Sequence, residues 1–285
     1  MILKALPKTV TCGPGIEWGN ARQWVLFAGP DLLESEGLVL EVGQELKRIT
    51  QSLQIPWVLK CSFDKANRSS SKSFRGLGVQ DSLKLLDKIK SQLDVPLVTD
   101  IHDVSQVGEV AQVAEVLQIP AFLSRQTDLI QAAAKTGRVL NIKKGQFLAP
   151  WDMRSVAAKA RDVGNDKILL CERGTSFGYN RLVNDMTGLK IMRDENLCPV
   201  VFDATHSVQL PGGKGDSSDG RRDMIDALAR AAMAVGVDGL FFETHPDPDR
   251  ALCDGPNSLA LSDMPRVLSS LQSIWKTIQS PIQGP

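Results

Sequence analysis

The sequence predicts an α/β fold, specifically a closed (β/α)8 barrel. Two observations lead to this prediction. Eight short runs of buried-type residues recur along the 285-residue chain, and between them lie longer segments whose apolar residues repeat every three or four positions. The short runs are apolar almost throughout, as parallel strands covered on both faces should be. Eight strands that alternate with helices indicate a barrel. A doubly wound open sheet is the alternative, but it usually has fewer strands, and no glycine-rich dinucleotide motif follows the first run.

The elements are expected in a regular order. We expect strands at residues 24–28, 57–62, 96–99, 121–124, 139–142, 168–171, 200–203 and 239–242. Helical spacing, as in Leu38, Val42 and Leu46, predicts helices at residues 38–53, 79–93, 107–117, 129–135, 153–163, 223–235 and 264–278. We treat residues 1–285 as a single barrel domain, with residues 1–20 as an extension in front of it. Within that extension, β-type pairs on both sides of Gly13-Pro14-Gly15 predict a short hairpin that closes the bottom of the barrel.

Composition and charge exclude several classes of protein. Lysine and arginine total 33, as do aspartate and glutamate, so a generally basic nucleic-acid-binding protein is not expected. No apolar run approaches about 18 residues, which argues against a membrane-spanning helix. The first ten residues lack the pattern of an export signal. Five scattered cysteines without zinc spacing fit a reduced, cytoplasmic setting.

Polar side chains follow nearly every expected strand. The carboxyl ends of barrel strands are where such enzymes place their reactive groups. For any one strand, a polar residue could simply mark a loop, but eight strands with the same feature indicate a shared site. The residues concerned include Asp31, Lys60, Asp100, His102, Arg125, Lys143, Arg173, Asp203, His206, Glu243 and His245.

Cations dominate these strand ends in a chain of zero net charge. Like charges repel when they are brought together, so such a cluster implies anionic ligands, paired acids, or both; structural salt bridges around the rim are the alternative. Asn67, Arg68 and Ser69 offer amide, guanidinium and hydroxyl donors in succession, which suits a phosphate. Six cations exceed the need of one phosphate, so we expect two phosphorylated substrates, or one phosphate and one phosphocarboxylate. The six are Lys60, Lys65, Arg68, Arg125, Lys143 and Arg173.

A second group combines one imidazole with three carboxylates. Asp31, His206, Glu243 and Asp254 come from the first, seventh and eighth strands, which are neighbours once a barrel closes. Such a set could bind Mn²⁺, Fe²⁺ or Zn²⁺. His206 could instead act as a general acid that one of the carboxylates orients, or the group could be a structural hydrogen-bonded cluster. These three interpretations remain open at the level of sequence.

Long motifs in the chain resemble one enzyme family. FDKANRSS at residues 63–70, DATHSVQ at residues 203–209 and several further strings, from about Trp24 to the last helix, closely resemble 3-deoxy-D-manno-octulosonate-8-phosphate synthases. The resemblance implies condensation of phosphoenolpyruvate with D-arabinose 5-phosphate by a cytoplasmic homotetramer that serves lipopolysaccharide biosynthesis. The related 3-deoxy-arabino-heptulosonate-7-phosphate synthases, which use erythrose 4-phosphate, share the barrel and are the alternative. A catalytically inactive sugar-phosphate-binding barrel is not favoured, because the expected cations and His206 are all present.

The resemblance also assigns roles to residues. It implies that Lys60, Lys143 and Arg173 hold phosphoenolpyruvate, with four further side chains close by: Ser62, Lys65, Gln118 and His206. It places arabinose 5-phosphate against Asn67, Arg68 and Ser69, with Arg125 reaching that phosphate from a neighbouring subunit. The residues that it assigns to the chemistry itself are Lys60, Lys65, Asn67, His206 and Asp254.

Asp31 is the one departure from the family pattern. Metal-dependent relatives carry cysteine at this position and metal-independent ones carry asparagine, whereas Cys253 before Asp254 resembles the metal-independent class. Three carboxylates beside an anionic substrate would leave at least one protonated or turned toward a lysine unless a cation is bound. Aspartate is also a competent ligand for Mn²⁺ or Mg²⁺. The sequence therefore allows either no required cofactor or a divalent metal (Mn, Fe or Zn) held by Asp31, His206, Glu243 and Asp254.

Overall fold

The computed structural model describes residues 7–66, 74–213 and 218–279. Its centre is a closed barrel of parallel strands, because β14 pairs with both β11 and β3 and the remaining strands pair in chain order. This confirms the expected (β/α)8 fold. The barrel strands are β3 (Val25–Gly29), β4 (Trp57–Lys60), β5 (Leu97–Asp100), β6 (Val116–Ile119), β7 (Val139–Lys143), β8 (Ile168–Glu172), β11 (Val200–Asp203) and β14 (Gly239–His245).

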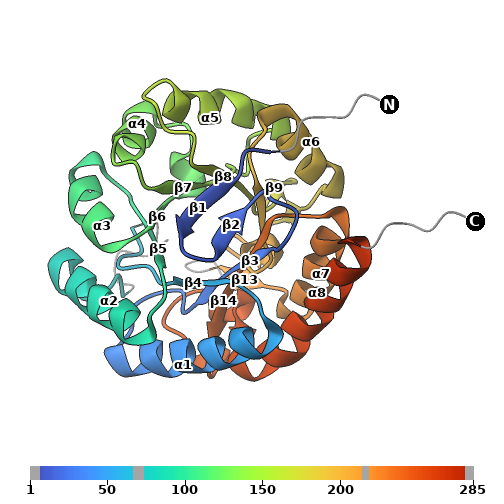
Figure 1. The fold of residues 1–285 in the computed structure, drawn as a ribbon. Coiled ribbons are helices and arrows are strands. Elements are labelled where there is room, and N and C mark those ends of the chain that lie inside the picture. Colours follow the sequence, from blue (N-terminus) through green and yellow to red (C-terminus); the bar gives the residue numbers. More distant parts are fainter. Residues whose placement is uncertain (1–6, 67–73, 214–217, 280–285) are drawn as a thin grey trace, which may run out of the picture.

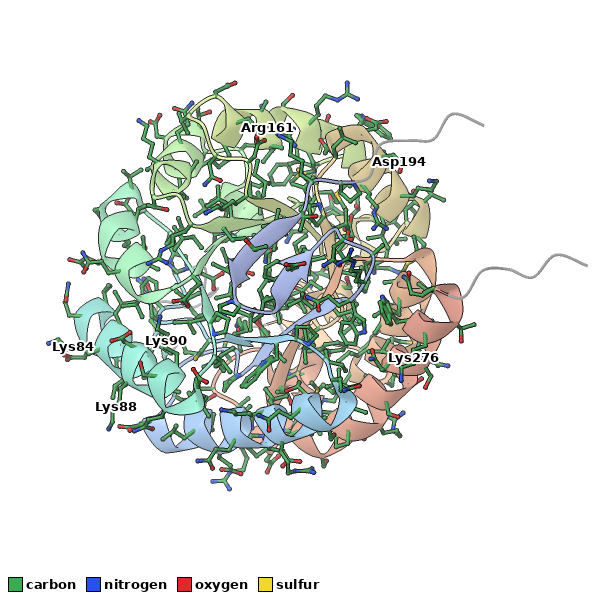
Figure 2. All side chains as sticks on the ribbon, viewed as in Figure 1. Lys84, Lys88, Lys90, Arg161, Asp194 and Lys276 are labelled. Carbon is green, nitrogen blue, oxygen red and sulfur yellow. The ribbon has the colours of Figure 1, made fainter. Side chains whose placement is uncertain are left out.

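The helices form a ring around the barrel (Figure 1). Each buries an apolar stripe against the strands, and α1 shows the pattern with Val39, Val42 and Leu46 fully buried. Figure 2 shows Lys84 and Lys88 pointing outward from α2 at the rim of this ring. Over the described residues, none of these helices has the length and apolar character that a membrane span requires. The helices are α1 (Glu36–Leu53), α2 (Val79–Leu93), α3 (Val107–Val113), α4 (Thr127–Lys135), α5 (Met153–Arg161), α6 (Met186–Asn196), α7 (Ile225–Val235) and α8 (Met264–Gln279).

The fourth strand is misplaced in the sequence-based expectation. The strand is β6 (Val116–Ile119), and residues 121–123 form a 3₁₀ turn in which Phe122 is 57% exposed. The expected helix at 107–117 ran into this strand because a strand buried on both faces shows no alternation, so Leu117 continued the helical spacing. Pro120 ends the strand, since proline has no N–H to offer to a ladder.

Helix α6 is not among the helices expected from periodicity. Its buried face contains Gly188 and Asn196 beside Leu189 and Met192, so the apolar repeat is broken in the sequence. The helix begins at a clear signal nevertheless. The side chain of Asp185 accepts a hydrogen bond from the backbone N–H of Thr187 at 2.9 Å and caps the first turn.

The predicted hairpin closes the amino-terminal end of the barrel. β1 (Val10–Gly13) and β2 (Ile16–Trp18) pair antiparallel, and in Figure 1 they lie over the centre of the ring of helices. The ring of Trp18 stacks on that of Phe27 inside the barrel, with centroids 5.4 Å apart. A Cβ at Gly239 would lie only 2.8 Å from a backbone oxygen of β3 and 3.2 Å from the Trp18 indole nitrogen, so the first residue of β14 has to be glycine. The hairpin does not cover the carboxyl end of the strands, where the loops that follow the strands lie.

Short strand pairs are built into those loops and flank the mouth of the barrel. β9 (Thr175–Ser176) pairs with β10 (Leu182–Val183) after β8, and β12 (Gln209–Leu210) pairs with β13 (Asp219–Gly220) after β11. β15 (Leu259–Ala260) adds to the end of β14. These pairs give the loops a defined backbone where the polar strand ends emerge.

Candidate active site

A cavity of about 250 Å³ lies at the carboxyl end of the barrel. Three of the expected cations line it, namely Lys65, Lys143 and Arg173, and each is buried. One wall is formed by the turn after β6, including Pro120 and Phe122. The other polar residues around the cavity are Asp100, His102, Gln118, Gln146 and His206.

Lys60 lies beside this cavity within a buried cluster of charges. Its ammonium donates to the carboxylate of Asp31 at 3.0 Å, to the backbone oxygen of Asp31 at 2.6 Å and to Glu243 at 2.7 Å. Lys65 also contacts the Asp31 carboxylate and is 3.9 Å from Glu243. Lys60 is therefore not itself part of the cavity lining, because the acids of β14 and of the loop after β3 hold its ammonium.

The carboxyl groups of this cluster have strongly different pKa values. Burial, with the nearby charge of Asp31, raises the pKa of Glu243 to about 8. Burial also acts to raise the pKa of Asp31, but Lys60 and Lys65 outweigh it and hold that pKa well below its ordinary value. Burial and Asp31 raise the pKa of Asp254. These surroundings match the sequence-based expectation that, without a bound cation, at least one carboxyl would be protonated or turned toward a lysine.

Asp203 connects His206 to Lys143. Its Oδ2 atom is 2.8 Å from the Lys143 ammonium and 2.8 Å from Nδ1 of His206. On the other side of the ring, Nε2 is 3.7 Å from both Glu243 and Asp254. Burial lowers the pKa of His206, in opposition to Asp203, and the neutral ring with its proton on Nδ1 leaves a free electron pair on Nε2. Asp203 is among the polar strand ends expected from the sequence, but no role was assigned to it there.

A buried hydrogen-bond chain runs along the cavity from the loop after β4, through β5 and β6, to β7. Ser62 donates to Asp100 at 2.5 Å, Gln118 donates to the same carboxylate, and Asn141 donates to the Gln118 oxygen at 2.8 Å. The structure thus brings Ser62 and Gln118 to the site, with Gln118 in β6. Asn141 was not expected there, and its signal was a polar residue within an otherwise apolar strand.

Arg173 presents its guanidinium to the cavity and is only 4% exposed. Its Nη2 atom donates to Gln209 at 2.9 Å, and its buried Nη1 atom has no hydrogen-bond partner among the described residues. The amide nitrogen of Gln209 reaches Asp254 at 3.4 Å, so this side chain links the guanidinium to the carboxylate. Gln209 was not expected at the site, and its only signal was its place at the end of the DATHSVQ motif.

Two expected parts of the site stay predictions. Asn67, Arg68 and Ser69 lie outside the described residues. Arg125 is exposed just before α4 and is absent from the cavity lining. Its expected place in the site of a neighbouring subunit stays a prediction, because the described structure is that of a single chain.

The acidic cluster has the donor set of a divalent cation site. His206, Glu243 and Asp254 offer ligand atoms within 4.8 Å of one another, as do Asp31, Cys253 and Asp254. The Oδ2 atom of Asp31 and the Oε2 atom of Glu243 are buried without a partner in the described part of the chain. Nitrogen and carboxylate donors of this kind suit Mn²⁺, Fe²⁺ or Zn²⁺, so the residues present fit such an ion.

A (β/α)8 barrel that gathers buried lysine and arginine side chains around a small cavity at its strand ends defines an enzyme of small anionic substrates. The model of the DAHP synthetase I family matches residues 5–280, and the chain belongs to that family. It is 56% identical to the 2-dehydro-3-deoxyphosphooctonate aldolase of Nitrosococcus oceani, over 93% of this chain and 95% of that protein. It is 57% identical to the proteins of the same name from Thioalkalivibrio sulfidiphilus and Methylococcus capsulatus, over 93% of this chain and 94% of each. The resemblance stated from the motifs is confirmed.

Proposed function

We propose that the protein condenses phosphoenolpyruvate with D-arabinose 5-phosphate and water to give 3-deoxy-D-manno-octulosonate 8-phosphate and inorganic phosphate. The observation that carries this proposal is the convergence of Lys65, Lys143 and Arg173 on one cavity. It is supported by relatives that are named 2-dehydro-3-deoxyphosphooctonate aldolase and align with this chain over nearly their whole length. The heptulosonate alternative has only the family-level match in its favour. The product belongs to lipopolysaccharide biosynthesis, as the family resemblance implies.

The cavity suits phosphoenolpyruvate because it presents several cations to a small molecule that carries an anionic group at each end. Arg173 has a buried Nη1 atom without a partner among the described residues, and Lys143, which lines the same cavity, lies 3.5 Å from Nδ1 of His206. We assign the carboxylate and phosphate of phosphoenolpyruvate to these two cations and to Lys65. The family resemblance assigns arabinose 5-phosphate to Asn67, Arg68 and Ser69, which lie outside the described residues.

The chemistry needs a proton donor for the aldehyde and an acceptor for the attacking water. Carbon 3 of the enol attacks the aldehyde carbon, whose oxygen takes up a proton, and water adds to carbon 2 and gives up a proton. The resulting hemiketal phosphate then breaks the bond between carbon 2 and the phosphate oxygen; the electron pair leaves with inorganic phosphate, which takes up the proton that the carbon 2 hydroxyl loses as the ketone forms. Glu243, with its raised pKa, is protonated near neutral pH and suits the donor role, while Nε2 of the neutral His206 suits the acceptor role. Both groups lie within 3.7 Å of one another.

We propose that this reaction proceeds without added metal, because Lys60 and Lys65 already neutralise Asp31 within the acidic cluster. A divalent ion held by Asp31, His206, Glu243 and Asp254 would supply a Lewis acid to the aldehyde oxygen. The test is turnover after exhaustive chelation, with the metal content measured on the same sample. Full activity without metal supports the proposal, whereas loss of activity that Mn²⁺ restores would overturn it.

We propose a cytoplasmic homotetramer in which Arg125 of one copy completes the site of another. Large aromatic side chains on the loops after β6, β7 and β8 support contact between copies, since each is more than half exposed around the barrel mouth. They are Phe122, Phe147, Trp151, Phe177 and Tyr179. Light scattering of the purified protein tests the assembly, and an active monomer would contradict it. All five cysteines are unpaired, which agrees with a reducing compartment.

Phosphate release measured with three acceptors tests the function. Phosphoenolpyruvate is supplied alone, with arabinose 5-phosphate, or with erythrose 4-phosphate, and the sugar products are identified by mass. We expect rapid release only with arabinose 5-phosphate. Faster release with erythrose 4-phosphate would establish the heptulosonate alternative, and no release with either sugar would indicate a binding protein without this activity.

A further inference from the structure

The structure assigns a positioning role to a buried ion pair, Lys144 with Glu172, which lies behind the anion-binding cavity. Lys144 follows β7 and Glu172 ends β8, so the pair joins the two neighbouring strands that deliver Lys143 and Arg173. Neither residue has a role in the chemistry proposed above. The inference rests on the proposed function, because it concerns how the phosphoenolpyruvate site is held in shape.

Lys144 is a fully buried cation whose bonds are all to protein. Its ammonium donates to the backbone oxygen of Leu148 at 3.1 Å and to the hydroxyl of Thr175 at 3.1 Å, and it is 3.5 Å from a carboxylate oxygen of Glu172. A buried ammonium is strongly unfavourable unless it is paired and hydrogen-bonded. These partners belong to the loop after β7 and to the loop after β8, so the cation ties the two loops together.

Glu172 fixes the backbone from which Arg173 projects. Its Oε1 atom accepts hydrogen bonds from the N–H groups of Arg173 at 2.9 Å and Gly174 at 2.7 Å. Gly174 has a φ of 98°, a conformation that side-chain-bearing residues rarely adopt. The carboxylate of Glu172 therefore stabilises a sharp backbone turn directly after β8, at the residue that carries the guanidinium.

The alternation of side chains along a strand explains why the pair lies where it does. Successive residues point to opposite faces, so Lys143 and Lys144 cannot both face the cavity, nor can Glu172 and Arg173. Lys143 and Arg173 line the cavity, and their immediate neighbours pair with each other on the other side. An inward pair of cations is thus braced by an outward ion pair on the same two strands.

The two loops are also joined by their backbones. The N–H of Ser176 donates to the backbone oxygen of Gln146, which itself lines the cavity, at 2.9 Å. Loss of the ammonium would leave this bond and the Glu172 contacts but would free the loop at Leu148 and Thr175. We therefore expect the geometry of the phosphoenolpyruvate site to suffer more than that of the sugar-phosphate site.

Three variants test this role: Lys144→Met, Glu172→Gln, and the two combined. Each single change leaves one charge buried without its partner, so both single variants should unfold at a lower temperature than the wild type. The double variant removes both charges and keeps an oxygen that can accept from Arg173 and Gly174, so its unfolding temperature should recover. It still lacks the bonds from the ammonium to Leu148 and Thr175. Lys84→Met, at an exposed lysine on α2, is the matched control.

The decisive readout is the affinity of the folded double variant for phosphoenolpyruvate. We expect its KM for phosphoenolpyruvate to rise roughly 10- to 100-fold, as a small displacement of positioning groups does, and its KM for arabinose 5-phosphate to stay within about threefold. Calorimetry of phosphoenolpyruvate binding should show the same loss without turnover. A folded double variant with wild-type affinity for phosphoenolpyruvate would overturn the inference, as would an equal loss for both substrates. Failure of the wild type to release phosphate would refute the proposed function instead, and calorimetry would still test the ion pair.

Discussion

Replacement of Arg173 by alanine gives the sharpest test of the anion site. The guanidinium has one nitrogen bonded to Gln209 and another that is buried without a partner among the described residues, so it can offer a substrate anion two N–H groups. A hydrogen bond to a charged group contributes about 1.5–3 kcal/mol. Loss of a two-pronged contact should therefore cost about 3–6 kcal/mol, which corresponds to a fall in kcat/KM of roughly 10²- to 10⁴-fold.

The assay is steady-state phosphate release with phosphoenolpyruvate as the varied substrate. Arg173→Lys keeps the charge but not the planar fork, so its loss should lie between those of the wild type and the alanine variant. Arg48→Ala is the control, because this arginine is on α1 and its side chain is 66% exposed. Circular dichroism and thermal unfolding should show that each variant is folded. A folded Arg173→Ala enzyme with kcat/KM within threefold of wild type would refute the assignment of the anion site.

Three further predictions concern other parts of the molecule. Asp203→Asn removes the carboxylate between Lys143 and His206, so kcat should fall roughly 10²- to 10⁴-fold in steady-state assays; a wild-type kcat would contradict the proposed role of the imidazole. The folded state raises the pKa of Glu243 from 4.5 to about 8, so the stability that this group contributes is greatest below about pH 4.5 and is lost as the pH rises to about 8. Glu243→Gln should therefore flatten the decline in the free energy of unfolding across this range, measured by urea unfolding of chelated protein; an unchanged slope would count against the raised pKa. Trp18→Ala should lower the free energy of unfolding by about 3–5 kcal/mol, since it leaves a cavity where the buried indole of the hairpin packs on Phe27. It should leave the KM for both substrates unchanged, and an unaltered unfolding temperature would contradict the packing argument.

The acidic cluster illustrates how charge and burial together select protonation states. Asp31 and Glu243 lie beside the same two lysines, yet their pKa values move in opposite directions. Two ammonium groups cannot neutralise the three clustered carboxyl groups of Asp31, Glu243 and Asp254, and the surplus charge is accommodated by a proton near neutral pH. A bound divalent cation would displace that proton, so proton release on addition of Mn²⁺ would report directly on occupation of the cluster.

Local pattern was sufficient for the barrel and for most of its site. The apolar runs and helical repeats predicted seven of the eight strands close to their observed positions, and the polar strand ends predicted that Lys65, Lys143, Arg173 and His206 would meet. These features are encoded locally, because a strand buried on both faces and the polar residue that follows it are adjacent in the chain. The position of the fourth strand was predicted wrongly because Val116 and Leu117 are apolar residues that fit the buried face of a helix and a buried strand equally well.

Only the folded chain decided which charges are paired with one another. Consecutive lysines at 143 and 144 look alike in the sequence, but the pleat of β7 turns one toward the cavity and the other toward Glu172. The sequence likewise named Lys60 as a cation of the mouth, whereas the closure of β14 against β3 places it between two acids. Residue type and strand order are local properties of a chain, while the partner of a buried charge is set by distances between strands that are far apart in sequence.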